Sequence, residues 1–100
     1  MPAGKPDESS MVAHAEWRGI ALKIGYIPKR FPGMDHIEVR SAESVPLPIT
    51  ETGYRSLFIL PERLEEYGDP ATYVLAWLDH EAQSAAWKRY EADRKQLGLF

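Results

Sequence analysis

Cysteine is missing from this sequence of 100 residues. Its absence excludes disulfides, thiolate zinc sites and thiol catalysis, and it suits a reducing compartment. Long apolar runs are missing too: none approaches the roughly 20 residues that a membrane-spanning helix needs, and no basic segment followed by an apolar run marks a signal peptide. We therefore expect a cytoplasmic protein with no membrane partner.

An excess of positive charge is also lacking. The 12 Lys and Arg residues are outnumbered by 15 Asp and Glu residues, so that the net charge is −3. Because a dedicated nucleic-acid binder normally presents a basic face, no direct contact with nucleic acid is expected. The hydrophobic fraction of 44% and the aromatic fraction of 11% predict instead one ordinary globular core.

Motifs that carry catalytic chemistry are absent as well. The sequence has no glycine-rich phosphate loop and no nucleophile elbow. Asp79-His80-Glu81 resembles a cluster of metal ligands, but adjacent residues of a helix point in different directions, and no second histidine stands four residues away. We predict no catalytic residue, no metal site and no cofactor. An enzyme with an unrecognised site stays open as the least favoured class.

The sequence does contain the pattern of an α+β domain. Apolar and polar residues alternate over 20–26 and again over 36–40, which predicts two half-buried strands, the first of them ended by Pro28. A continuous apolar run over 54–60 predicts a third strand, buried at the centre of the sheet. We expect about three antiparallel strands.

Helical signals fill the C-terminal half. Pro61 begins a short helix that Gly68 can end in the left-handed conformation, and Asp69 is an N-cap with proline directly after it. The composition is then helical over 70–95. We favour one long helix packed on one face of the sheet over two helices, of which Ser84 would cap the second.

Residues 1–15 are expected to form a flexible leader, 16–95 a single domain and 96–100 a C-terminal peptide.

One polar run is a candidate binding loop. It connects a proline-containing segment to the third strand, and loops held by rigid elements often carry binding groups. Tyrosine and arginine are also enriched at the centres of protein interfaces. The candidate residues are Thr50, Glu51, Thr52, Tyr54 and Arg55. The alternative is a simple turn, in which Gly53 takes a positive φ and Tyr54 packs down.

Three segments carry a resemblance to a known family: residues 17–19, 46–56 and 76–82, together with the leucine-rich C-terminal end. They resemble a family of small bacterial proteins of plasmids and other mobile elements. The resemblance spans most of the chain after residue 15 and implies a bacterial or mobile-element origin. The family has no activity to carry over, so no catalytic residue follows from it.

The last five residues, 96–100, place three large apolar side chains where a chain end is usually polar. A helix-ending turn at Gly98 would need an apolar partner one turn earlier, and Asp93 and Arg94 stand there instead. Leu99 and Phe100 therefore either dock on this domain or are offered to another protein.

This pentapeptide resembles the peptide by which bacterial replication and repair proteins bind the DNA-polymerase sliding clamp, with the pattern Gln-Leu, Ser or Asp, Leu-Phe. The resemblance implies that Gln96 makes amide hydrogen bonds, that Leu97 adds apolar contact, and that Leu99 and Phe100 fill a hydrophobic pocket. Gly98 departs from the pattern, and its backbone freedom should lower the affinity.

The leading hypothesis is a non-enzymatic protein-interaction module whose candidate partner is the sliding clamp. The alternative is a mobile-element-encoded inhibitor that blocks a host defence or nuclease complex, because a small acidic protein can occupy a basic nucleic-acid-binding surface.

Overall fold

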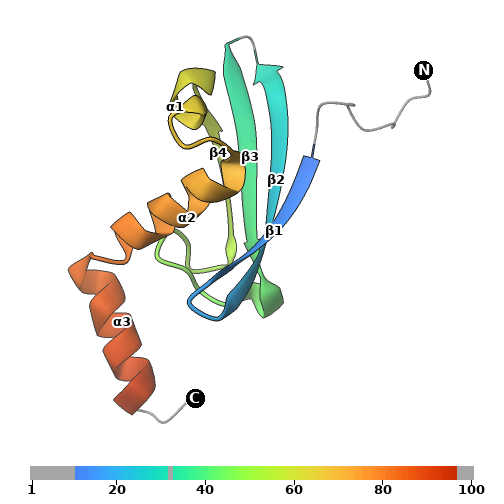
Figure 1. The fold of residues 1–100 in the computed structure, drawn as a ribbon. Coiled ribbons are helices and arrows are strands. Elements are labelled where there is room, and N and C mark those ends of the chain that lie inside the picture. Colours follow the sequence, from blue (N-terminus) through green and yellow to red (C-terminus); the bar gives the residue numbers. More distant parts are fainter. Residues whose placement is uncertain (1–10, 32, 97–100) are drawn as a thin grey trace.

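The computed structural model describes residues 11–31 and 33–96. The elements follow one another as β1 (Met11–Trp17), β2 (Ile20–Phe31), β3 (Met34–Ser41), η1 (Ala42–Ser44), β4 (Tyr54–Ile59), α1 (Pro61–Glu65), α2 (Pro70–Glu81) and α3 (Ala85–Gln96) (Figure 1). The predicted α+β class is confirmed. Within the described ranges, no helix has both the length and the apolar character that crossing a bilayer requires.

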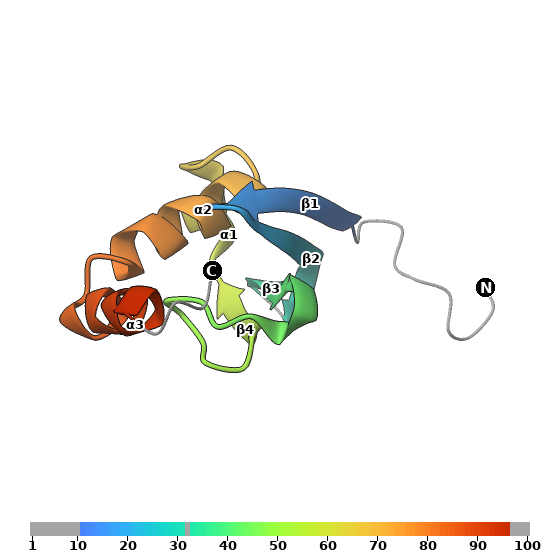
Figure 2. The same cartoon turned by 90° about the horizontal axis from the view of Figure 1, so that it is seen from below.

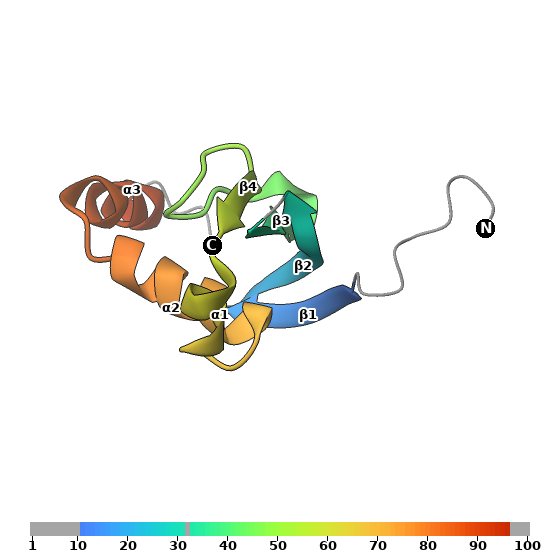
Figure 3. The same ribbon diagram turned by 90° about the horizontal axis from the view of Figure 1, so that it is seen from above.

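The sheet is antiparallel, with the strand order β1-β2-β3-β4. Its strands form an arc, and α1 and α2 lie on the inner side of that arc (Figures 2 and 3). Alternate residues of β2 and β3 point inward, and Ile24 and Ile37 are completely buried there with Val74 and Leu78 of α2. The other side of the sheet carries the remaining residues of each strand, and we call it the open face.

The prediction of three strands is wrong by one, because β1 lies largely in the segment expected to be a leader. Residues 11–15 pair with β2, from Met11 opposite Tyr26 to Ala15 opposite Leu22. Between Met11 and Trp17 the inward positions hold the small residues Ala13 and Ala15, so the hydrophobic alternation is weak in the sequence. Residues 1–10 lie outside the described part of the chain.

Two further strand predictions need correction. Pro28 does not end β2, because the strand continues to Phe31 through a register irregularity between Ile27 and Phe31. Such an irregularity accommodates a residue that has no amide proton. β4 is an edge strand rather than the central one. Its apolar run is continuous because Leu57 and Phe58 lie on opposite faces of the sheet.

The helix boundaries follow the capping residues. The Thr72 amide donates to the Asp69 carboxylate at 2.7 Å, and this hydrogen bond holds the pKa of Asp69 below its usual range. The Trp87 amide donates to the Ser84 hydroxyl at 3.1 Å. The preferred single long helix is therefore wrong, and the alternative of two helices with a cap at Ser84 is confirmed.

A polar pair joins neighbouring strands on the inner side of the sheet. The Tyr26 hydroxyl donates to Oδ2 of Asp35 at 2.8 Å, and Asp35 is buried. Burial, followed by this hydrogen bond and the charge of Asp35, raises the pKa of Tyr26 to about 12. The folded state therefore holds the phenolic proton more tightly than the unfolded chain does.

This raised pKa gives stability that is fully present below the unfolded pKa of about 10 and is lost as the pH rises towards about 12. We expect Tyr26→Phe to be less stable than the wild type at neutral pH, because the variant lacks the hydrogen bond. The difference in the free energy of unfolding between the two proteins should become smaller between about pH 10 and 12, because only the wild type loses this contribution there. Urea unfolding of both proteins across that pH range measures this difference. A difference that stays constant would contradict the raised pKa of Tyr26.

Two glycines allow a matched test of backbone strain. Gly53 has a φ of +81°, and a Cβ there would lie 2.6 Å from both Oγ of Ser41 and Cα of Ser44. A Cβ at Gly25 would meet the Cβ of Glu38 at an ordinary 3.8 Å. We expect Gly53→Ala to lower the free energy of unfolding by about 2 kcal/mol or more, and Gly25→Ala to raise it by about 0.5 kcal/mol. Chemical denaturation of both variants decides, and equal effects would refute the strain at Gly53.

Candidate functional site

A groove of about 640 Å³ runs between the β3–β4 connection and α3. One wall is residues 46–51, and the other is formed by Ser84, Ala86, Trp87 and Tyr90. We call it the loop–helix groove. Its lining is mixed: proline, aliphatic and aromatic side chains share the surface with polar groups, among them the Thr50 hydroxyl and the Glu51 carboxylate on the loop side.

The loop wall is held in place by its own hydrogen bonds. Leu47 and Thr50 exchange two backbone hydrogen bonds, at 2.8 and 3.0 Å, which close a tight turn around Pro48. The Arg55 guanidinium donates to the Ile49 carbonyl at 2.8 Å, and Leu47 and Ile49 are buried in the core. A wall fixed in this way loses little conformational entropy when a ligand binds.

The helix wall depends on two aromatic residues. The Trp87 and Tyr90 rings lie 4.9 Å apart, centroid to centroid, and Trp87 also packs against Trp17 of β1 at 6.0 Å. An ion pair between Arg18 and Glu91, at 3.6 Å, adds a contact at the same end of the sheet. Because this ion pair is largely solvent-exposed, it contributes little stability. Aromatic packing is therefore the main contact that holds α3 against the rest of the domain.

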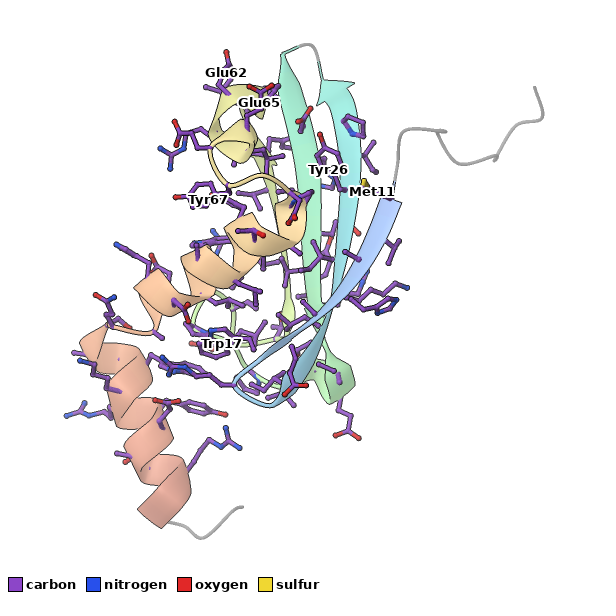
Figure 4. All side chains as sticks on the ribbon, viewed as in Figure 1. Met11, Trp17, Tyr26, Glu62, Glu65 and Tyr67 are labelled. Carbon is purple, nitrogen blue, oxygen red and sulfur yellow. The ribbon has the colours of Figure 1, made fainter. Side chains whose placement is uncertain are left out.

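The turn between β1 and β2 supplies these contacts. Arg18 and Gly19 both have positive φ, at 50° and 85°, as the two central residues of a type I′ hairpin turn require. The Nε1 atom of Trp17 donates to Oδ1 of Asp79 in α2 at 2.9 Å. Trp17 thus lies where the hairpin meets the two longer helices (Figure 4).

The predicted binding loop is divided among three places. Thr50 and Glu51 line the groove. Thr52 and Arg55 support the loop: the Thr52 amide donates to Oγ1 of Thr50 at 3.2 Å, and Arg55 holds Ile49. Tyr54 lies on the open face, where the Arg40 guanidinium stacks over its ring at 4.3 Å. The positive φ expected of Gly53 is confirmed, but Tyr54 does not pack into the core.

The C-terminal candidate begins at the end of α3. Gln96 is the last residue of that helix, and Leu97, Leu99 and Phe100 lie outside the described residues. The described helix that precedes the predicted peptide, α3, forms one wall of the groove, and Thr50 and Glu51 of the predicted loop lie in the other wall.

Sequence reasoning missed both aromatic groove residues and both prolines. Trp87 and Tyr90 were assigned to a helix by composition alone, although they are the two aromatic residues of an otherwise polar segment and stand three residues apart. That spacing places them on one side of a helix. Pro46 and Pro48 lie in the proline-containing segment before the candidate loop, for which no binding role is predicted from the sequence.

The chemistry of the groove favours binding. Apolar and aromatic walls with a few polar groups are typical of ligand-binding and protein-binding surfaces. Across residues 11–31 and 33–96, no three side chains of His, Asp or Glu come together as a metal site.

A match to one family covers most of the chain. The family described as the KlcB third domain matches residues 10–87, which includes the sheet, α1, α2 and the loop wall of the groove. The match ends at Trp87, so Tyr90 and the pentapeptide lie beyond it. No curated protein and no solved structure matches this chain.

The two packed tryptophans differ in hydrogen bonding, which allows a prediction. Nε1 of Trp87 is buried without a hydrogen-bond partner among the described residues, whereas that of Trp17 is bonded to Asp79. We expect Trp87→Phe to cost about 1 kcal/mol less than Trp17→Phe in chemical denaturation, because only the second change removes a hydrogen bond. Trp87→Ala, which removes the ring, should cost about 3 kcal/mol or more. Equal costs for the two Phe variants would contradict this account.

Proposed function

The chain belongs to the KlcB third domain family, which is plasmid-associated, and we propose that it is a non-enzymatic protein-interaction module. Its partner is the bacterial DNA-polymerase sliding clamp, bound through Gln96, Leu97, Leu99 and Phe100. The loop–helix groove beside α3 adds a second contact with the same partner.

The observation that carries the proposal is the groove itself. It combines a fixed loop wall with two aromatic side chains, and aromatic residues provide much of the binding energy at protein interfaces. Thr50 and Glu51 provide polar groups at its edge, where interfaces are usually polar.

The position of α3 supports a joint role for groove and peptide. Tyr90 and Gln96 are six residues apart on one helix, which corresponds to about 9 Å along the axis. A protein that holds the pentapeptide therefore comes within reach of the groove. Contacts at both sites would strengthen each other, because binding at the first places the second at a high effective concentration.

A peptide of residues 96–100 should bind purified clamp at about micromolar strength, or about −8 kcal/mol. The full chain should bind more tightly than the peptide. Leu99→Ala with Phe100→Ala should abolish binding of the full chain without lowering its melting temperature. Isothermal titration calorimetry and thermal unfolding measure the two effects. A melting temperature lower by several degrees would mean that these side chains belong to the core, and the clamp proposal would then fail.

Two further variants separate the peptide from the groove. Gly98→Ser restores the clamp-binding pattern and reduces backbone freedom, so it should raise the affinity. Glu51→Ala at the groove should weaken binding of the full chain towards the affinity of the isolated peptide, which contains no groove. Inhibition of a host defence or nuclease complex that survives removal of the pentapeptide would favour the inhibitor hypothesis instead.

A further inference from the structure

The open face of the sheet carries a row of side chains that the groove does not use. The strand registers place His14 opposite Lys23, Lys23 opposite Arg40, and Arg40 opposite Tyr54. The row thus crosses all four strands, over about 14 Å at a spacing of about 4.8 Å per strand. Three of its members are basic and the fourth is aromatic.

Among the described residues, the two permanent positive charges in this row have no partner of opposite sign. Lys23 and Arg40 are exposed, and in the described part of the chain neither forms an ion pair with a carboxylate. Glu38 and Glu16 stand on the same face, in the rows on either side. Lys23 and Arg40 are therefore available to an anionic ligand.

Aromatic side chains accompany the charges. Phe58 of β4 is 41% exposed, and its ring lies 4.7 Å from that of His36. Tyr54, two positions further along the same face of β4, is 36% exposed beneath the Arg40 guanidinium. Aromatic rings and guanidinium planes are the groups on which unpaired bases stack.

Beside these rings the face is hollowed at Gly25. A space of about 350 Å³ is lined there by residues that include Val12, Ile27, His36 and Glu38. It exists because Gly25 has no side chain between Val12 and Glu38, its neighbours on the adjacent strands. A flat ring placed against His36 and Phe58 would lie next to this hollow.

The acidic net charge of the chain does not exclude an anionic ligand on the open face, because several of the acidic residues lie at α1. Glu62, Glu65 and Glu66 are exposed in and directly after α1. That helix follows the end of β4 opposite to Tyr54, and Figure 4 shows Glu62 and Glu65 at the far end of the sheet from Trp17. From the row of Lys23, Arg40 and Tyr54 to α1, the separation along β4 and its continuation is about 20 Å, more than the screening length of about 8 Å at physiological salt. Phe58 lies nearer to α1, but it contributes a ring and no charge.

We propose that the open face binds single-stranded nucleic acid, with phosphates at Lys23 and Arg40 and bases stacked at Tyr54 and Phe58. A single strand fits because its bases are unpaired and can reach the rings, whereas a duplex keeps them stacked inside. The inference is independent of the clamp proposal, since none of these residues belongs to the groove or to the pentapeptide.

Fluorescence anisotropy with a labelled oligothymidylate of about 12 nucleotides tests this on the full chain. At about 50 mM salt we expect a dissociation constant of about 10 µM or tighter. Lys23→Gln with Arg40→Gln should weaken binding at least ten-fold. It should also reduce the slope of log affinity against log salt by about 1.4, because each phosphate contact on a single strand contributes about 0.7.

The matched control is Lys88→Gln with Arg89→Gln, which removes two exposed charges from α3 and changes the net charge by the same amount. It should leave the affinity unchanged within about two-fold. Phe58→Leu keeps an apolar side chain but removes the ring, and it should weaken binding about five-fold or more. Circular dichroism confirms that each variant is folded. An oligouridylate and a duplex of equal length show whether the sugar and the unpaired bases matter.

Three results would overturn the proposal. The first is no binding by the wild-type chain at low salt. The second is an equal loss in the two double variants, which would indicate nonspecific attraction to any positive charge. The third is competition by polyglutamate as strong as by unlabelled oligonucleotide together with full affinity of Phe58→Leu, which would assign the face to an acidic protein segment.

Discussion

The side chain of Trp17 is the contact on which the arrangement of the helices depends. It is buried at the end of β1, donates a hydrogen bond to Asp79 of α2 and packs against Trp87 of α3. A single indole therefore ties the sheet to both longer helices. Since α3 is otherwise largely polar and exposed, the aromatic contact decides where this helix lies, and with it one wall of the loop–helix groove.

The loop wall is fixed by a different kind of interaction. The 45–53 connection has little regular secondary structure, so its backbone groups must find partners locally. They do so through the reciprocal Leu47–Thr50 pair, and the loop end is held because the Ser41 amide donates to the Gly53 carbonyl at 2.8 Å. A hydrophobic contact holds one wall and backbone hydrogen bonds hold the other, so the groove is preorganised from both sides.

The sequence predicted the elements whose signal is local. The cap at Asp69, the left-handed Gly68 and the alternation of β3 each depend on a few neighbouring residues, and each is found. β1 was missed because its inward alanines give almost no periodicity, and it becomes a strand by pairing with β2. The groove could not be predicted as a whole, because its two walls are more than 30 residues apart in the sequence. The position of the helix wall also depends on the contact between Trp87 and Trp17, which no local pattern indicates.

The two surfaces are connected through one short segment. Thr50 lines the groove, Tyr54 stands on the open face, and Oγ1 of Thr50 donates to the Tyr54 carbonyl at 2.9 Å. A ligand in the groove and a ligand on the open face would therefore contact opposite ends of the same hydrogen-bonded turn. Because Arg40 stacks on Tyr54, a shift of this turn would also move a cation of the open face. Coupling between the two sites needs no long pathway. Only the hydrogen bond from Thr50 to Tyr54 and the contact of Arg40 with the Tyr54 ring lie between the loop wall of the groove and the basic row.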